Sequence, residues 1–317
     1  MLVLRADPWM PEFGMGFEVP LDEAPGPADP FVETEDWSAP VSPAPTPPGA
    51  VSFVDGVRRI DLRLIAEQDR SRAPGLFGSY AVGCVTSDGR ASFGDSAVGR
   101  AVVLAGGLRP ERVEIVAGTE RLEFDPDSQA GTDPDRPLWG LQQLMRRAEA
   151  AMAAKAAARG DGVVIVDGPL TFSDPTKSPV VGVVKRFARM YLEPEHDALA
   201  GRLRPGERTP LFGIGDEERP VDRYAWYVRL VPSQRHWHEH AGVVRCEVRE
   251  GVGLESAVSL ADRVSAMLPA YAGRPSDPRA PQNLAPVGSL ERRLRHRLGH
   301  PGIVRRALIA WLAAAGG

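Results

Sequence analysis

Two short stretches decide the fold class of this chain: VSFVDG at residues 51–56 and VVIVDGPL at residues 163–170. Each opens with an apolar run, which predicts a buried strand, and each then reaches an Asp-Gly pair. We expect Asp55 and Asp167 to emerge where their strands end, at the sheet edge where open α/β sheets commonly bind ligands. An ordinary Asp-Gly turn is the alternative explanation for either motif.

Apolar patterns on both sides of these motifs supply the rest of the fold. They predict further strands at residues 76–85, 101–105, 112–118, 121–125, 180–187, 209–214, 224–230 and 242–248, a helix or turn at 62–68, a loop at 125–137, and helices at 138–159, 256–268, 289–298 and from 303 onward. Strands 112–118 and 121–125 are expected to form a hairpin across Gly118 and Thr119. The order predicts an α/β protein with a mixed sheet flanked by helices.

The N-terminal region differs in composition from the rest. Residues 20–50 are rich in proline, alanine and acidic residues, which predicts an extended or disordered segment that buries little surface. Phe31 and Trp37 are the residues within it that would anchor it elsewhere. We therefore divide the chain into an N-terminal arm, residues 1–50, and one domain, residues 51–317.

Composition excludes several classes of protein. The 317 residues carry a net charge of -4, so any surface that binds nucleic acid must be local. Cys84 and Cys246 have no CxxC partner and are expected to be buried thiols in a reducing compartment. Neither a signal peptide nor a membrane span is predicted, which favours a cytoplasmic protein. The absence of GxxxxGK[ST] and of a strand-GxGxxG-helix pattern argues against a nucleotide-binding enzyme.

Carboxylates are the strongest candidates for chemistry. Asp55 and Asp167 would repel each other at one sheet edge unless a divalent cation lay between them, and oxygen ligands favour Mg²⁺ or Mn²⁺. Glu149 lies on the helix before the second motif, next to Met145 and Met152, although a solvated glutamate is the alternative. Lys185 is one of only three lysines and ends an apolar strand, which suggests a point charge near phosphate.

The C-terminal region is locally basic. Residues 274–306 hold eight arginines and two acidic residues. Four of the arginines lie on the short predicted helix and suit contacts with phosphate: Arg292, Arg293, Arg295 and Arg297. A solvated helix surface is the alternative.

Three histidines alternate in the sequence RHWHEH, at residues 235–240. On a strand, His236, His238 and His240 would share one face and could bind zinc. The segment follows Pro-Ser, so we interpret it instead as an exposed loop between strands.

Together these motifs resemble the NurA nucleases. The resemblance rests on FVDG, a helix glutamate, IVDGPL and a strand ending in lysine, and on the stretches GERTPLF, WYVRL and DPRAPQNLAPVGSLERRLRHRLG, which look like the bacterial branch. It covers roughly residues 50–310. It implies an RNase H-like core, cleavage of single- and double-stranded DNA with Mn²⁺ or Mg²⁺, and a homodimer docked on a hexameric HerA-like translocase in DNA end processing and double-strand break repair.

The resemblance also implies roles for individual residues. Asp55, Glu149 and Asp167 match the family's carboxylate ligands, and Lys185 matches the strand-end lysine. The family uses a late histidine near a tyrosine, but no tyrosine occupies PQNLAPVG here. His296 is the first candidate for that ligand, followed by Glu291 and Asp277. Glu291 and His296 are five residues apart, so one helix face does not present both.

Two other functions fit the same residues. An inactive RNase H-like scaffold would keep the fold and bind DNA or a translocase without cutting. A nuclease directed at RNA would keep the metal site and change the substrate.

Overall fold

The computed structural model describes residues 2–7, 28–44, 49–69, 71–160, 162–170, 172, 179–185, 191–215, 219–273 and 282–315. Asp277 lies outside these residues. The strands are β1 (Val3–Ala6), β2 (Ala28–Asp29), β3 (Val51–Gln68), β4 (Ser71–Ser87), β5 (Ala91–Leu104), β6 (Val113–Ala117), β7 (Glu120–Ser128), β8 (Val163–Asp167), β9 (Val180–Val184), β10 (Phe212–Ile214), β11 (Arg223–Arg229) and β12 (Val243–Arg249). The α-helices are α1 (Arg136–Ala157), α2 (Pro194–Arg202), α3 (Leu254–Met267), α4 (Ala285–Arg297) and α5 (Pro301–Ala315), with short 3₁₀ turns at Glu250–Val252 and Leu268–Tyr271.

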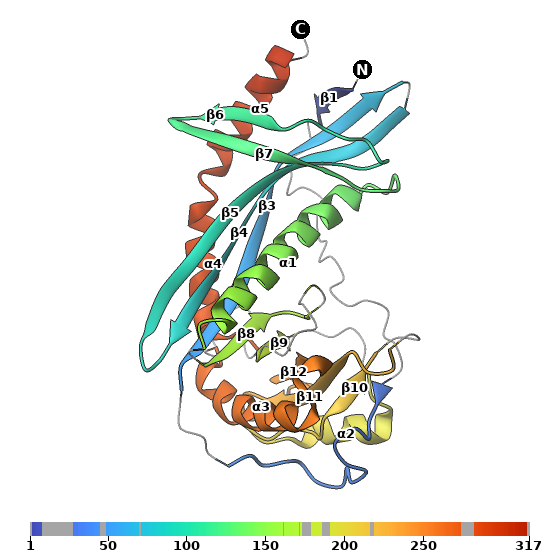
Figure 1. The fold of residues 1–317 in the computed structure, drawn as a ribbon, viewed down its shortest axis with the longest axis vertical. Helices are drawn as coiled ribbons and strands as arrows, with labels where there is room; N and C mark the ends of the chain where they lie inside the picture. Colours follow the sequence, from blue (N-terminus) through green and yellow to red (C-terminus); the bar gives the residue numbers. More distant parts are fainter. Residues whose placement is uncertain are drawn as a thin grey trace.

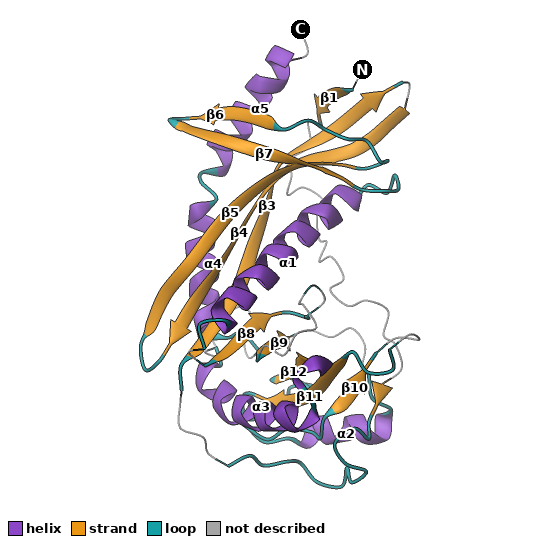
Figure 2. Ribbon diagram, in the orientation of Figure 1, coloured by secondary structure: helices purple, strands orange, loops and turns teal. Residues whose placement is uncertain are grey.

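One mixed sheet organises the described residues. Its strand order is β2-β10-β11-β12-β9-β8-β3-β4-β5-β7-β6, with β1 added beside β3. Strands β3, β8 and β9 run parallel to one another, whereas β3 pairs with β4 and β9 pairs with β12 antiparallel. Figure 1 shows the long β3, β4 and β5 strands with α1 across them, and the shorter strands gathered with α2 and α3 at the other end. The predicted mixed α/β sheet flanked by helices is confirmed (Figure 2).

The two faces of the sheet near β3 pack against different helices. Val51, Phe53 and Val57 pack with residues of α3 and α4 in one buried cluster. Val54 packs with Ala153 of α1 in another cluster on the opposite face. Successive residues of a strand point to opposite faces, so odd-numbered residues of β3 face α4 and even-numbered residues face α1 in this stretch.

Strand β3 is much longer than the sequence predicts. It continues past Asp55 to Gln68, so the expected strand end at Asp55 and the expected helix or turn at 62–68 are both wrong. The pairing of β3 with β4 shifts between Ile60 and Leu62, which marks a β-bulge. Beyond the bulge Leu62, Leu64 and Ala66 are buried. Buried and partly exposed residues therefore alternate in both halves of β3, but the buried positions are mainly odd-numbered before the bulge and even-numbered after it.

The other predicted elements are largely confirmed. Helix α1 lies within two residues of its predicted bounds, and β6 and β7 form the predicted hairpin, with Ala117 opposite Glu120. Strand β7 runs to Ser128, so residues 125–128 are not loop. Both cysteines are buried and free. Within the described part of the chain, none of the helices has the length and hydrophobicity of a membrane span.

The N-terminal region is not separate from the domain where the structure describes it. β1 pairs with β3, β2 pairs with β10, and Trp37 is buried. Arg208, which is 1% exposed, donates to both carboxylate oxygens of Glu33 at 2.8 and 2.9 Å, and Leu211 N donates to Glu33 at 2.6 Å. Residues 28–44 are therefore attached to the domain, with Trp37 as an anchor that the sequence predicts and with Phe31 exposed, and residues 8–27 and 45–48 lie outside the described residues.

Glu33 is expected to contribute strongly to stability, because its removal leaves a buried guanidinium short of a partner. We predict that Glu33→Gln lowers the free energy of unfolding by about 3 kcal/mol, the usual cost of breaking one side of a buried ion pair. Urea denaturation followed by circular dichroism measures this. Glu35→Gln, at an exposed position two residues away, is the matched control. Equal stability of the two variants would show that the segment does not support the fold.

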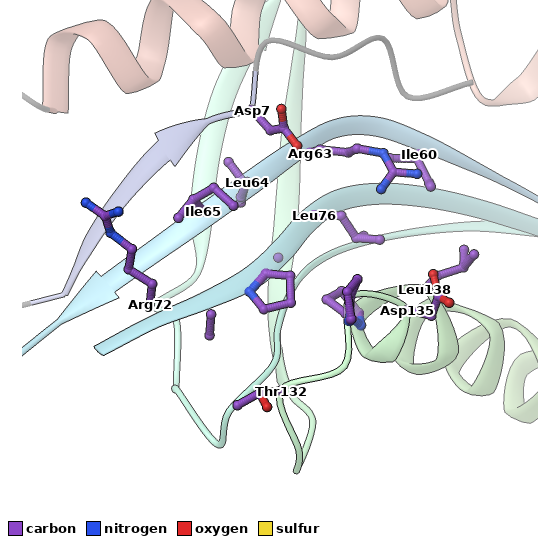
Figure 3. A pocket seen from close by; sticks show the side chains of 15 residues that line it. Asp7, Ile60, Arg63, Leu64, Ile65, Arg72, Leu76, Thr132, Asp135 and Leu138 are labelled. Carbon is purple, nitrogen blue, oxygen red and sulfur yellow. The ribbon is translucent and has the colours of Figure 1, made fainter. Parts of the chain in front are cut away.

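A cavity of about 450 Å³ lies between the second half of β3, β4 and the beginning of α1. Figure 3 shows Arg63, Leu76, Asp135 and Leu138 among the side chains that line it. None of the candidate carboxylates lines this cavity, so it is not the site that the sequence predicts.

Candidate metal centre

Asp55 and Asp167 lie side by side because their strands are parallel neighbours. Val54 of β3 is paired with Val166 of β8, so the next residue on each strand is an aspartate at the same level of the sheet. One oxygen from each carboxylate, together with one from Glu291, lies within 4.8 Å of the others. The expectation that the two aspartates converge is confirmed.

Glu291 reaches the aspartates from α4. Leu290 and Leu294 of this helix are buried in the same cluster as Phe53. This packing places the helix on the face of β3 to which Asp55 also belongs. Glu291 is itself only 7% exposed. His296, the first sequence candidate, is exposed and is not part of the cluster. Five residues along a helix correspond to a rotation of about 140°, so His296 faces away from Glu291.

Glu149 approaches from the other face of the sheet. It projects from α1 onto Gly56, where an added Cβ would lie 2.5 Å from Glu149 Oε1. Its other oxygen accepts a hydrogen bond from Arg146 at 2.7 Å, and Arg146 also donates to the main-chain oxygen of Asp167 at 2.9 Å. Glu149 is therefore next to the site, but it does not share the oxygen cluster of Asp55, Asp167 and Glu291.

Lys185 lies at the same edge of the sheet, directly after β9. Its Nζ donates to Asp167 Oδ2 at 2.7 Å and to Asn283 Oδ1 at 3.5 Å. The lysine and the aspartate side chains are each 15% exposed. Lys185 thus places one positive charge beside the three carboxylates, and Asn283 is a neighbour that the sequence pattern did not single out.

The electrostatics of the cluster favour a bound cation. Asp55 is buried, and its Oδ2 has no hydrogen-bond partner among the described residues. Burial raises the pKa of Asp55 well above its ordinary value of 3.8, and the nearby charges of Asp167 and Glu149 raise it further. Burial also raises the pKa of Glu149, against the opposing effect of Arg146. A divalent cation would remove the repulsion that produces these shifts.

The donor set fits magnesium or manganese. All three converging groups are carboxylates, and hard oxygen ligands are those that Mg²⁺ and Mn²⁺ prefer. Asp55 Oδ2 is buried and has no hydrogen-bond partner among the described residues, so it is an oxygen that such an ion could bind. The residues present therefore fit such an ion.

The C-terminal end of α4 is fixed by a partly buried network that the sequence pattern did not reveal. Arg59 donates to the main-chain oxygens of Leu298 at 3.0 Å and Gly299 at 2.7 Å. Arg59 also donates to Asp61 at 2.7 Å, and Asp61 is 3% exposed. Cations at a helix C-terminus satisfy its free carbonyls and its dipole. This network holds the helix that supplies Glu291.

The four candidate DNA-binding arginines of α4 are all exposed and all have contacts within the chain. Arg293 lies over the ring of Phe93 at 4.7 Å, and Arg297 donates to Ser96 Oγ. The other two contact their own helix: Arg292 donates to Ser289 Oγ at 3.1 Å, and Arg295 lies 3.8 Å from a Glu291 oxygen. The arginines therefore form an exposed basic surface beside the carboxylate cluster.

The raised pKa of Asp55 predicts how stability depends on pH. The folded state binds the Asp55 proton more tightly than the unfolded chain does. The contribution of this proton to the free energy of unfolding is therefore complete below pH 3.8 and is lost as the pH rises through the raised pKa. We expect the melting temperature of the metal-free protein to fall over this window. Asp55→Asn should reduce the fall, and the exposed substitution Glu111→Gln should leave it unchanged. Identical pH profiles for all three proteins would contradict the assignment.

Comparison with known proteins identifies the family. A family model described as the NurA domain matches residues 53–289. The chain belongs to the NurA family. Asp55, Glu149 and Asp167 lie inside the matched range, and Glu291 lies just beyond it. Membership of this family supports the assignment of the chain as a nuclease.

The chain is also similar to solved structures. One of them is the NurA nuclease from Sulfolobus solfataricus, with a TM-score of 0.48 and 11% sequence identity over 87% of this chain and 86% of that chain. A search among curated proteins found no match.

Proposed function

We propose that this chain is a deoxyribonuclease that depends on Mn²⁺ or Mg²⁺, and that Asp55, Asp167 and Glu291 hold the ion. The observation that carries the proposal is the convergence of these three carboxylates from β3, β8 and α4. Family membership supports the nuclease activity, and the all-oxygen donor set supports the class of metal. The sequence-based assignment of His296 as a ligand is replaced here by Glu291.

The ion would supply Lewis acidity to the scissile phosphodiester and lower the pKa of the attacking water. The chain's own residues would do the rest. Lys185 balances the charge of Asp167 and lies where it can contact a phosphate oxygen. Glu149 holds Arg146, which in turn holds the main chain of Asp167, so we assign Glu149 a positioning role.

We propose that the exposed arginines of α4 contact the DNA backbone. Such contacts release counterions, so they carry charge and no base specificity. Arg292 and Arg293 begin this surface one residue after Glu291, which places bound phosphates near the proposed ion. Ring stacking of Phe93 under Arg293 keeps that guanidinium at the surface.

The remaining proposals rest on the resemblance of the motifs to the family. They are cleavage of both single- and double-stranded DNA, a homodimer, and a hexameric HerA-like translocase as the partner in DNA end processing and double-strand break repair. A cytoplasmic location is proposed from the sequence alone.

A cleavage assay tests the function. End-labelled single-stranded DNA, duplex DNA and an RNA of matched sequence are each incubated with the protein and Mn²⁺, Mg²⁺ or EDTA. We expect both DNA substrates to be cut with Mn²⁺ or Mg²⁺, and no cutting with EDTA. Stronger cleavage of the RNA would reassign the substrate. Binding of DNA without cleavage in every metal would favour an inactive scaffold.

A further inference from the structure

The connection between β11 and β12 brings together three potential metal ligands outside the carboxylate centre. These are His238, Glu239 and His240, each of which offers one atom within 4.8 Å of the other two. The connection is a loop, as its sequence predicts, and His238 and Glu239 are exposed in it. The histidines nevertheless converge, because the loop turns tightly instead of extending as a strand: Ala241 N donates to His238 O at 2.9 Å.

A second carboxylate, from α2, lies beside His240 within ion-pair distance but outside hydrogen-bond geometry. His240 Nε2 lies 3.2 Å from Asp197 Oδ2, and its Nδ1 lies 3.9 Å from Glu239 Oε1. A carboxylate at Nε2 favours the proton on that nitrogen and leaves the lone pair on Nδ1, the side that faces Glu239. Metal-binding histidines commonly have this arrangement, in which an outer carboxylate fixes the tautomer and the ring.

His238 presents a lone pair to the same space. Its Nδ1 accepts a hydrogen bond from His240 N at 3.3 Å, so this nitrogen is the unprotonated one. The rings of His238 and His240 are stacked, with centroids 5.3 Å apart. The bond is long, and an ion placed between the two δ nitrogens and Glu239 would replace it with a stronger interaction.

The backbone of the loop is fixed before any ion binds. Arg229 is fully buried and donates to the main-chain oxygens of Glu239 at 2.6 Å and Ala241 at 2.7 Å, on either side of His240. It also donates to Gly201 O of α2 at 3.0 Å. One guanidinium therefore ties the loop to the helix that carries Asp197, and less ordering entropy is lost when a ligand binds.

We propose that His238, Glu239 and His240 form a second metal site, which takes a borderline transition-metal ion such as Zn²⁺, with Asp197 as the residue that orients His240. Ligand atoms around a four-coordinate zinc ion lie roughly 3.4 Å apart, given bonds of about 2.1 Å. The 3.9 Å between His240 and Glu239 needs only a small closure. Two imidazoles select zinc over magnesium, whereas the carboxylate centre has the opposite preference.

Titration of the full-length, metal-free protein with Co²⁺ tests the proposal. Co²⁺ in a four-coordinate nitrogen and oxygen site absorbs strongly in the visible range, unlike Co²⁺ bound by six oxygens. We expect this absorption in the wild type and in Asp55→Asn, its displacement by Zn²⁺, and no displacement by excess Mg²⁺. His238→Ala and His240→Ala should each weaken Co²⁺ binding by more than about tenfold, and Asp197→Asn by about 10- to 100-fold.

His236→Ala is the matched control, because His236 lies in the same loop and outside the cluster. It should bind Co²⁺ like the wild type. Absorption that survives in both His238→Ala and His240→Ala, or that disappears equally in His236→Ala, would overturn the proposal, as would its absence from the wild type. Loss in Asp55→Asn would place the ion in the carboxylate centre. DNA cleavage has no part in this readout, so the two proposals fail independently.

Discussion

Asp55→Asn is expected to reduce DNA cleavage by at least about 10³-fold while the protein remains folded. The substitution removes one of three carboxylates from the proposed ion, and the metal's charge stabilisation of the transition state is worth several kcal/mol. About 4 kcal/mol corresponds to a factor of 10³ in rate. At a pH above the raised pKa of Asp55, the metal-free variant should also melt at a higher temperature than the metal-free wild type, because a buried charge that neighbouring carboxylates repel has been removed.

Rates of cleavage with saturating Mn²⁺, measured beside circular dichroism melting curves, check both effects. Asp95→Asn is the control, because Asp95 is a surface aspartate paired with Lys155 and Arg159, outside the cluster. Wild-type cleavage by Asp55→Asn would remove this residue from the metal centre. A lower melting temperature of the metal-free variant would show that Asp55 stabilises the fold in a way that its contacts do not explain.

Glu291→Gln is expected to lower cleavage by about 10²-fold or more, whereas His296→Gln should retain nearly full activity. The two residues lie on the same helix, and only Glu291 converges with the aspartates. Glutamine keeps the shape of the side chain but cannot supply a charged ligand. A loss of about 3 kcal/mol in transition-state stabilisation corresponds to a cleavage rate lower by about 10²-fold. Cleavage rates over a range of Mn²⁺ concentrations separate weakened metal binding from a slower chemical step.

A result in which His296→Gln is inactive and Glu291→Gln is active would restore the sequence-based assignment. The helix would then have to rotate on binding metal or DNA. Arg59→Met provides a further comparison, since it frees the C-terminal end of α4 without touching the cluster. Arg59→Met should reduce cleavage activity less than Glu291→Gln does, and it should lower the free energy of unfolding more.

The sequence predicted the two aspartates because their signal is local. An apolar run followed by Asp-Gly occurs twice, and parallel neighbouring strands bring two such aspartates to one edge. Lys185 follows from the same logic, because β9 is the next parallel strand. Helix α1, with its strong apolar periodicity, was predicted within two residues, whereas α4 begins four residues before its predicted start.

The rest of the site depended on register and packing that no local pattern encodes. Glu149 lies on the face of the sheet opposite Asp55. Only the structure shows this, because there its side chain packs against Gly56. The choice between Glu291 and His296 depends on the rotation of α4 about its axis, which Leu290 and Leu294 set by packing against the core. The bulge at Asp61 shifts the alternation of buried and partly exposed residues by one position in mid-strand. For this reason the apolar pattern did not predict the second half of β3.

The N-terminal segment shows a similar limit. Its proline and acid content predicted a segment outside the core, and composition is a sound guide when no partner exists. Here a single acid, Glu33, is matched to the buried Arg208, and Trp37 enters a buried cluster. Long-range pairs of this kind, 175 residues apart in the chain, cannot be recognised from one sequence.

The most direct test of the metal centre is anomalous diffraction from crystals of the protein soaked in Mn²⁺. We expect an anomalous difference peak bounded by carboxylate oxygens of Asp55, Asp167 and Glu291, at metal–oxygen distances of roughly 2.0–2.4 Å, and no such peak in crystals of Asp55→Asn. A well-occupied peak elsewhere in the molecule, with none between these three residues, would contradict this expectation.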